Sequence, residues 1–91
     1  MRQDIEQVLK EIGYRLVDDS WDDQGRKTFL NSETADRSFM KELELALVKC
    51  GFKRHETSLR AFRDGSTGEF LEIEIGGPET SGHYLHYFRV E

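Results

Sequence analysis

The fold is decided by residues 52–90, which read FKRHETSLRAFRDGSTGEFLEIEIGGPETSGHYLHYFRV. Three runs rich in β-branched and aromatic residues are separated by clusters of Gly, Pro, Ser and Asp. This pattern predicts strands at Phe52–Arg63, Glu69–Ile75 and His83–Val90. Because such short connections can join only antiparallel neighbours, we expect these strands to form a meander.

The last of these strands differs from the one before it. Leu71, Ile73 and Ile75 alternate with glutamates, which is typical of a strand with one buried face. The strand from His83 to Val90 instead carries apolar or aromatic side chains on both faces. A chain of 91 residues has little material to cover both. The pattern therefore predicts self-association or a protein partner.

Two amphipathic helices are predicted upstream of the meander. Apolar residues recur at intervals of three and four in Met1–Ile12 and again in Ala35–Cys50. Each helix is followed by a glycine and an aromatic residue, Gly13-Tyr14 and Gly51-Phe52, which is a typical C-terminal capping signal. The two junctions indicate either a duplicated unit or the same capping chemistry used twice, and the sequence leaves both interpretations open.

A hairpin is expected between the helices, with strands at Arg15–Trp21 and Arg26–Leu30 and a turn rich in aspartate. The predicted fold class is therefore α+β, in the order α-β-β-α-β-β-β. We expect one domain over residues 1–91, with a mostly antiparallel sheet and two helices packed on one face.

Charge and composition limit the classes of partner. The net charge is −5, which disfavours nucleic acid as the default partner although the chain is locally basic. The start, Met1-Arg2-Gln3-Asp4, has no apolar segment of the secretory type, so a cytoplasmic location is expected. No apolar run approaches the ~18 residues of a membrane span, so we expect no membrane partner.

The basic segment 49–63 is the strongest binding candidate, because it holds five Lys and Arg residues against one Glu. Alternation along one strand would place Arg54 and Arg60 on one face and Lys53, His55 and Arg63 on the other. The charges suit either an edge strand that resists unwanted pairing or an RNA site with aromatic neighbours. A tryptophan in the acidic turn is a further candidate anchor. The candidate binding residues are Trp21, Lys53, Arg54, Arg60, Phe62, Arg63, Tyr84 and Tyr87.

Catalytic and metal chemistry find little support. His83 and His86 stand three residues apart, which places them on opposite faces of a strand, and whether His55 converges with either is left open. Cys50, the single cysteine, lies at the C-terminal end of a predicted helix, where the dipole disfavours a thiolate. No phosphate loop or nucleophile motif is present. We therefore predict no metal and no cofactor, and the sequence favours a non-catalytic domain while leaving enzymatic activity undecided.

A limited family resemblance covers Leu43–Gly77, where a helix, Gly51-Phe52, a polar strand, Asp64-Gly65 and an apolar strand follow one another. This order resembles the HicA-type toxin ribonucleases, which have a double-stranded-RNA-binding-like fold. That family carries a Gly-Ser-His motif in its first strand, and Thr57-Ser58-Leu59 stands there without a histidine. The resemblance therefore does not imply ribonuclease activity.

Two functions remain from the sequence. The first is a small non-catalytic interaction or adaptor domain that binds a protein partner or self-associates as a dimer through its sheet. The alternative is an RNA- or DNA-binding module that uses the basic segment 49–63. The sequence does not name the partner, the oligomeric state or the biological role.

Overall fold

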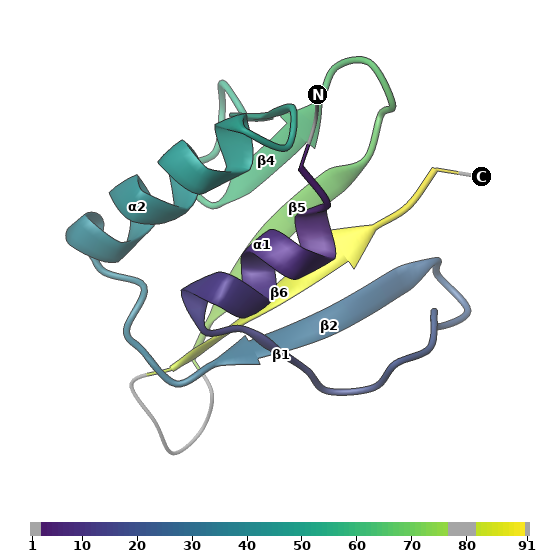
Figure 1. Cartoon of the computed structure of the whole chain (residues 1–91), viewed down its shortest axis with the longest axis horizontal. Helices are drawn as coiled ribbons and strands as arrows, with labels where there is room; N and C mark the ends of the chain where they lie inside the picture. Colours follow the sequence, from purple (N-terminus) through teal and green to yellow (C-terminus); the bar gives the residue numbers. More distant parts are fainter. Residues whose placement is uncertain (1–2, 77–81, 91) are drawn as a thin grey trace.

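The computed structural model describes residues 3–76 and 82–90, and it contains two helices and one six-stranded sheet (Figure 1). The sheet has the strand order β1-β2-β6-β5-β4-β3, and every neighbouring pair is antiparallel. The elements are α1 (Ile5–Ile12), β1 (Arg15–Leu16), β2 (Arg26–Asn31), α2 (Arg37–Val48), β3 (Phe52–Arg54), β4 (Ala61–Asp64), β5 (Phe70–Ile75) and β6 (His83–Phe88).

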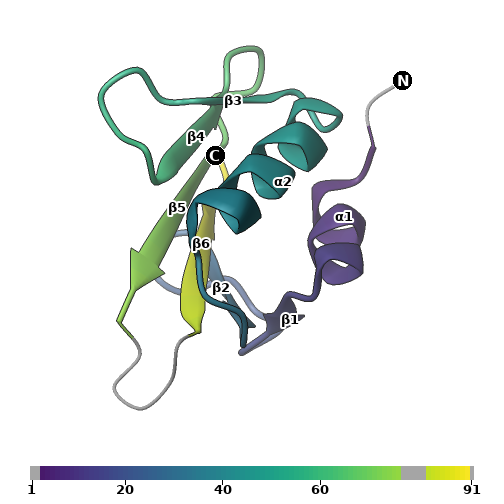
Figure 2. The ribbon, with the colours of Figure 1, turned by 90° about the vertical axis from the view of Figure 1, so that its left-hand side faces the viewer.

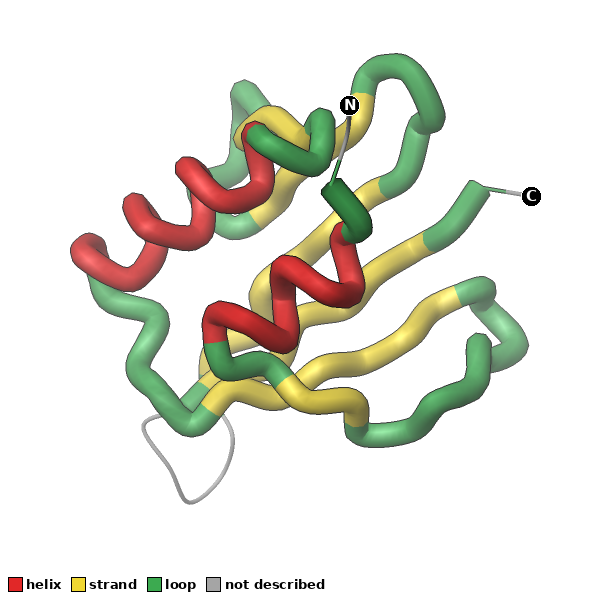
Figure 3. The backbone as a smooth tube through the Cα atoms, viewed as in Figure 1, coloured by secondary structure: helices red, strands yellow, loops and turns green. Residues whose placement is uncertain are grey.

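Strand β6 joins the two halves of the chain. It pairs along six residues with β5, its neighbour in the meander, and along six residues with β2 from the N-terminal half. Figure 3 shows β6 in the middle of the sheet, with the short strands β1 and β3 at the two edges. The strand that is apolar on both faces is therefore a central strand.

Both helices lie on the same side of the sheet, as Figures 1 and 2 show. We call this side the helix face and the opposite side the outer face. Leu85 and Tyr87 of β6 point into the core on the helix face, and both are buried. The core consists of Val8, Leu9, Tyr14, Phe29, Phe39, Leu43, Leu47, Cys50, Phe52, Phe62, Leu71, Ile73, Leu85 and Tyr87.

The helix ends follow from local hydrogen bonds. After α1, Gly13 takes the left-handed conformation at φ 110°, and the Tyr14 N–H donates to the carbonyl of Leu9, as the sequence predicts. Helix α2 begins at Arg37, two residues later than expected. The reason is Asp36, whose carboxylate accepts a hydrogen bond from the Phe39 N–H at 2.8 Å.

The predicted α+β class and the packing of both helices on one face are confirmed, but the expected strand Phe52–Arg63 is divided in two. Residues 55–60 form a loop that turns β3 back onto β4. Within it, the hydroxyl of Ser58 accepts a hydrogen bond from the Arg60 N–H, and the His55 ring bonds Thr57. Such local side-chain bonds compete with a strand ladder, which explains the break.

Most of the other predicted elements are shorter in the structure, whereas the strand expected at Arg26–Leu30 extends to Asn31. The first hairpin strand ends at Leu16 rather than Trp21, and a loop over residues 17–25 leads to β2. The last strand ends at Phe88 rather than Val90. The Gly/Pro-rich turn expected after Ile75 lies largely outside the described residues.

Candidate functional site

The β3–β4 hairpin sends its four cationic side chains to opposite sides of the sheet. Lys53 and Arg63 face each other across the two strands on the outer face. Arg54 lies on the helix face, 3.9 Å from Glu44 of α2, and Arg60 lines the same side. The two pairs therefore lie on opposite faces of the sheet, as predicted, although they belong to two strands and a loop rather than to one strand.

A row of aromatic and cationic side chains crosses the outer face. The strand register places Lys53, Arg63, Phe70, Phe88 and Arg26 side by side on β3, β4, β5, β6 and β2. The two phenylalanine rings, with centroids 6.0 Å apart, occupy the middle of this row and are half-buried. We call these five residues the outer row.

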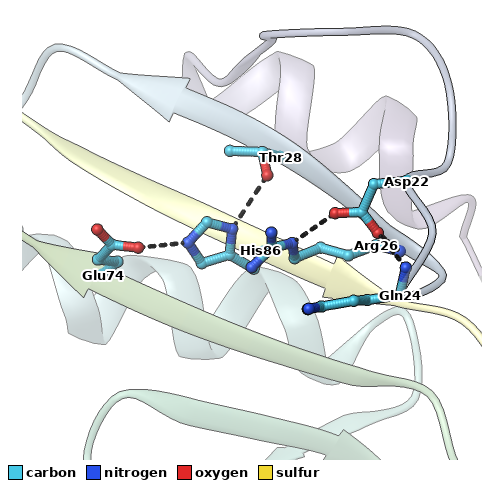
Figure 4. Close-up of polar contacts among 6 residues, drawn as sticks. All are labelled: Asp22, Gln24, Arg26, Thr28, Glu74 and His86. Atoms are coloured by element: carbon cyan, nitrogen blue, oxygen red, sulfur yellow. Dashed lines mark hydrogen bonds and ion pairs between the residues drawn. The ribbon is translucent and has the colours of Figure 1, made fainter.

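A second group on the outer face centres on His86. Its Nε2 donates to Oε1 of Glu74 at 2.7 Å, and its Nδ1 lies 3.0 Å from the hydroxyl of Thr28, as Figure 4 shows. The ring of Tyr84 stacks near it, with an interplanar angle of 18° and centroids 6.5 Å apart. Bonds at both ring nitrogens fix the orientation of the imidazole, so this part of the face is rigid.

The sequence of hydroxyl, imidazole and carboxylate in Thr28, His86 and Glu74 resembles a nucleophilic triad in its chemistry. Such a triad also needs donors that stabilise an oxyanion. Here the three residues lie on adjacent paired strands, where the backbone N–H groups are engaged in the ladder. What the contacts establish is that the imidazole of His86 is held between the Thr28 hydroxyl and the Glu74 carboxylate.

The three histidines do not converge. His83 is buried on the helix face, where its Nδ1 donates to the Glu33 carbonyl, while His86 lies on the outer face. His55 packs against Phe70, with ring centroids 6.3 Å apart. Among residues 3–76 and 82–90, no three His, Cys, Asp or Glu side chains cluster so that they could hold a metal ion.

Trp21 lies at the end of the helix face, half-buried against Tyr87. The cationic groups of Lys27 and Arg89 sit 4.8 Å and 4.7 Å from the centre of its ring. These contacts hold the tryptophan in place, and Asp22 fixes the turn beside it by accepting hydrogen bonds from Gln24 and Arg26 (Figure 4).

Two other predicted site residues are buried. Phe62 is 1% exposed, and Tyr87 is 5% exposed and donates its hydroxyl to Glu69. Burial, with the Glu69 carboxylate adding to it, raises the pKa of Tyr87. Cys50 is also buried, and burial together with the charge of Asp4 raises the pKa of its thiol. These side chains act through packing.

A groove opens on the helix face between α2 and the β3–β4 hairpin, with a volume of about 610 Å³. Arg54 and Arg60 line one wall, and the buried Phe62 borders the groove. The other wall comes from α2 and includes Arg37 and Lys41, which the sequence analysis did not single out. We call this the α2 groove. Two cations four residues apart on one helix were the signal available in the sequence.

In comparisons with known proteins, no family model, no curated protein and no solved structure matches the chain. The resemblance to HicA-type ribonucleases thus gains no support from them. In the described part of the chain, no helix is both long and apolar enough to cross a membrane.

Proposed function

We propose that this domain is a non-catalytic interaction module that binds a second copy of itself through the outer face of its sheet. The observation that supports this most is that both helices lie on the same side of the sheet, as Figures 1 and 2 show. Among residues 3–76 and 82–90, no helix covers the half-buried rings of Phe70, Tyr84 and Phe88 on the two central strands. Apolar surface gathered in this way favours association.

The charges on the outer face also favour a second copy as the occupant. Lys53 and Arg63 stand at the β3–β4 corner, whereas Glu72 and Glu74 lie along β5. A symmetric dimer uses the same patch on both subunits, so that patch must complement itself. A face that carries an apolar centre and both charge signs meets this requirement.

The proposal is tested by light scattering across a concentration series, with Phe88→Ser as the test variant. We expect the unmodified chain to dimerise. In the variant the dissociation constant of the dimer should rise at least about tenfold, because an aromatic side chain of the interface is lost. Leu45→Ser is the matched control, since Leu45 is 62% exposed but lies on α2. A chain that stays monomeric at every concentration, or equal effects of both variants, would contradict the proposal.

A second candidate function is single-stranded RNA or DNA binding, which the outer row favours. In this row Lys53, Arg63 and Arg26 border two phenylalanine rings, and cations beside stacking platforms are typical of single-strand readers. The net charge of −5 and the carboxylates on β5 oppose it. Salt-dependent binding to mixed oligonucleotides, lost in Arg63→Ala and kept in Arg60→Ala, would support this function over the dimer.

A further inference from the structure

We propose that the α2 groove is a separate binding site for a small organic anion with an apolar body. The groove is on the helix face, so it is distinct from the outer face described above. Its volume of about 610 Å³ lies within the range of small-molecule sites. The occupant is indicated by the two kinds of surface that line it.

The first kind of surface is cationic and stands on both walls. Arg37 and Lys41 come from α2, and Arg54 and Arg60 come from the β3–β4 hairpin. Arg37 and Lys41 are four residues apart on one helix, a spacing at which like charges repel. Arg37 also occupies the first turn of α2, where the helix dipole disfavours a cation. An anion between the walls would relieve these repulsions.

The two carboxylates of the groove balance only half of its four cationic charges. Asp36 is engaged as the cap of α2 through the Phe39 N–H, and Glu44 lies nearest to Arg54 at 3.9 Å. In the parts of the chain that the structure describes, no ion pair joins Arg37, Lys41 or Arg60 to a carboxylate. The groove therefore carries an excess of two positive charges.

The second kind of surface is apolar. It comes from Met40 of α2, Ile75 of β5 and Leu59, which is 73% exposed, whereas Phe62 borders the groove but is itself buried. Ile75 is also 46% exposed, which is high for an isoleucine in a sheet. An aromatic or branched aliphatic body would cover these side chains while its acidic group meets the arginines.

The test is a titration of the ¹⁵N-labelled chain with naphthalene-2-carboxylate, followed by NMR. We expect saturable shifts confined to the α2 groove and weaker binding of the uncharged 2-naphthalenemethanol. Arg54→Ala and Arg60→Ala should each weaken binding about tenfold, the effect of one lost charged hydrogen bond. Lys53→Ala and Arg63→Ala, which remove cations on the outer face of the same hairpin, should leave binding unchanged.

Three results would overturn the proposal: no saturable binding, equal binding of the acid and the alcohol, or equal losses in all four variants. Binding of a glutamate-rich peptide without binding of naphthalene-2-carboxylate would also overturn it, because the occupant would then be a protein segment. Phe88→Ser separates this site from the dimer, since it should alter the oligomeric state without changing anion binding.

Discussion

His83 is the most deeply buried ionisable side chain of β6, and both of its ring nitrogens are satisfied. Nδ1 donates to the carbonyl of Glu33 at 2.8 Å, and Nε2 therefore accepts from the hydroxyl of Tyr14 at 2.6 Å. This arrangement requires a neutral imidazole. It links β6 to the end of α1 and to the segment that precedes α2.

Removal of the Tyr14 hydroxyl should measure how much the hydrogen bond to His83 contributes to stability. Tyr14→Phe leaves Nε2 of His83 buried without a donor, and we expect it to lower the free energy of unfolding by about 1–3 kcal/mol. Urea denaturation provides the measurement. Tyr84→Phe, on the half-buried outer face, is the matched control and should change stability much less. Equal losses in the two variants would show that the link to His83 contributes nothing special.

The same histidine predicts a pH dependence of stability. Burial lowers the pKa of His83 below its ordinary value of 6.5, and the hydrogen bond to Glu33 offsets only part of this effect. Between 6.5 and the lower folded pKa, the unfolded chain binds a proton that the folded chain does not. The contribution is therefore complete above pH 6.5 and declines as the pH falls toward the folded pKa, by up to about 1.4 kcal/mol per pH unit.

This dependence is measured by urea denaturation at a series of pH values from about 4.5 to about 8. The series spans the ordinary histidine pKa. In His83→Gln the decline should be shallower below pH 6.5, because the titrating group is gone. Tyr84→Phe retains His83 and should keep the slope of the unmodified chain. Identical slopes in the glutamine variant and the unmodified chain would be inconsistent with a depressed His83 pKa.

At the scale of elements, the turn between β4 and β5 depends on two glycines in different ways. Gly68 has a φ of +79°, and a Cβ built there would lie 3.1 Å from Cγ2 of Val90. A Cβ on Gly65 would meet no atom of the described chain within 4 Å. Asp64 holds the turn between them by accepting hydrogen bonds from Ser66 and Thr67.

Thermal or urea unfolding should therefore separate the two glycines. Gly68→Ala is expected to destabilise the chain by about 1–2 kcal/mol, because an L residue is strained at this φ and crowds Val90. Gly65→Ala should change stability by no more than about 0.5 kcal/mol, as is usual for surface positions. If the two variants unfolded alike, the strain argued for Gly68 would be wrong.

The β3–β4 hairpin shows how far local patterns reach. Alternation correctly separated Arg54 and Arg60 from Lys53 and Arg63. The reason is that the residues paired across this hairpin lie an even number of positions apart in the chain, so the alternation of side chains continues from β3 into β4. The position of the loop at 55–60 was not predicted, since it depends on bonds made by the side chains of His55 and Ser58.

For the whole molecule, the position of β6 predicts a gradient of stability. It pairs on both sides along six residues, whereas β1 and β3 are edge strands of two and three residues. We expect the slowest native-state amide exchange at Leu85 and its neighbours in β5 and β2, and faster exchange at Arg15 and Lys53. Hydrogen exchange followed by NMR measures this order. Faster exchange in β6 than in β3 would contradict the architecture.

The two candidate binding surfaces also belong to the scale of the whole molecule. The outer face joins Phe70 and Phe88 of the meander to Arg26 of the N-terminal half. The α2 groove joins Arg37 of the helix to Arg60 of the hairpin. In each case residues far apart in the chain become neighbours. Sequence reasoning therefore found members of both surfaces and could not assemble either one.

By itself, the sequence determined the types of element, the glycine that ends α1 and the apolar character of both faces of His83–Phe88. These properties depend on neighbours within a few residues, through periodicity and capping. The tertiary structure alone decided that β2 pairs with β6, that both helices lie on the same side of the sheet and that Arg37 and Arg60 line one groove. The reason is that pairing between distant strands is selected by burial across the whole core, for which no local stretch carries a signal.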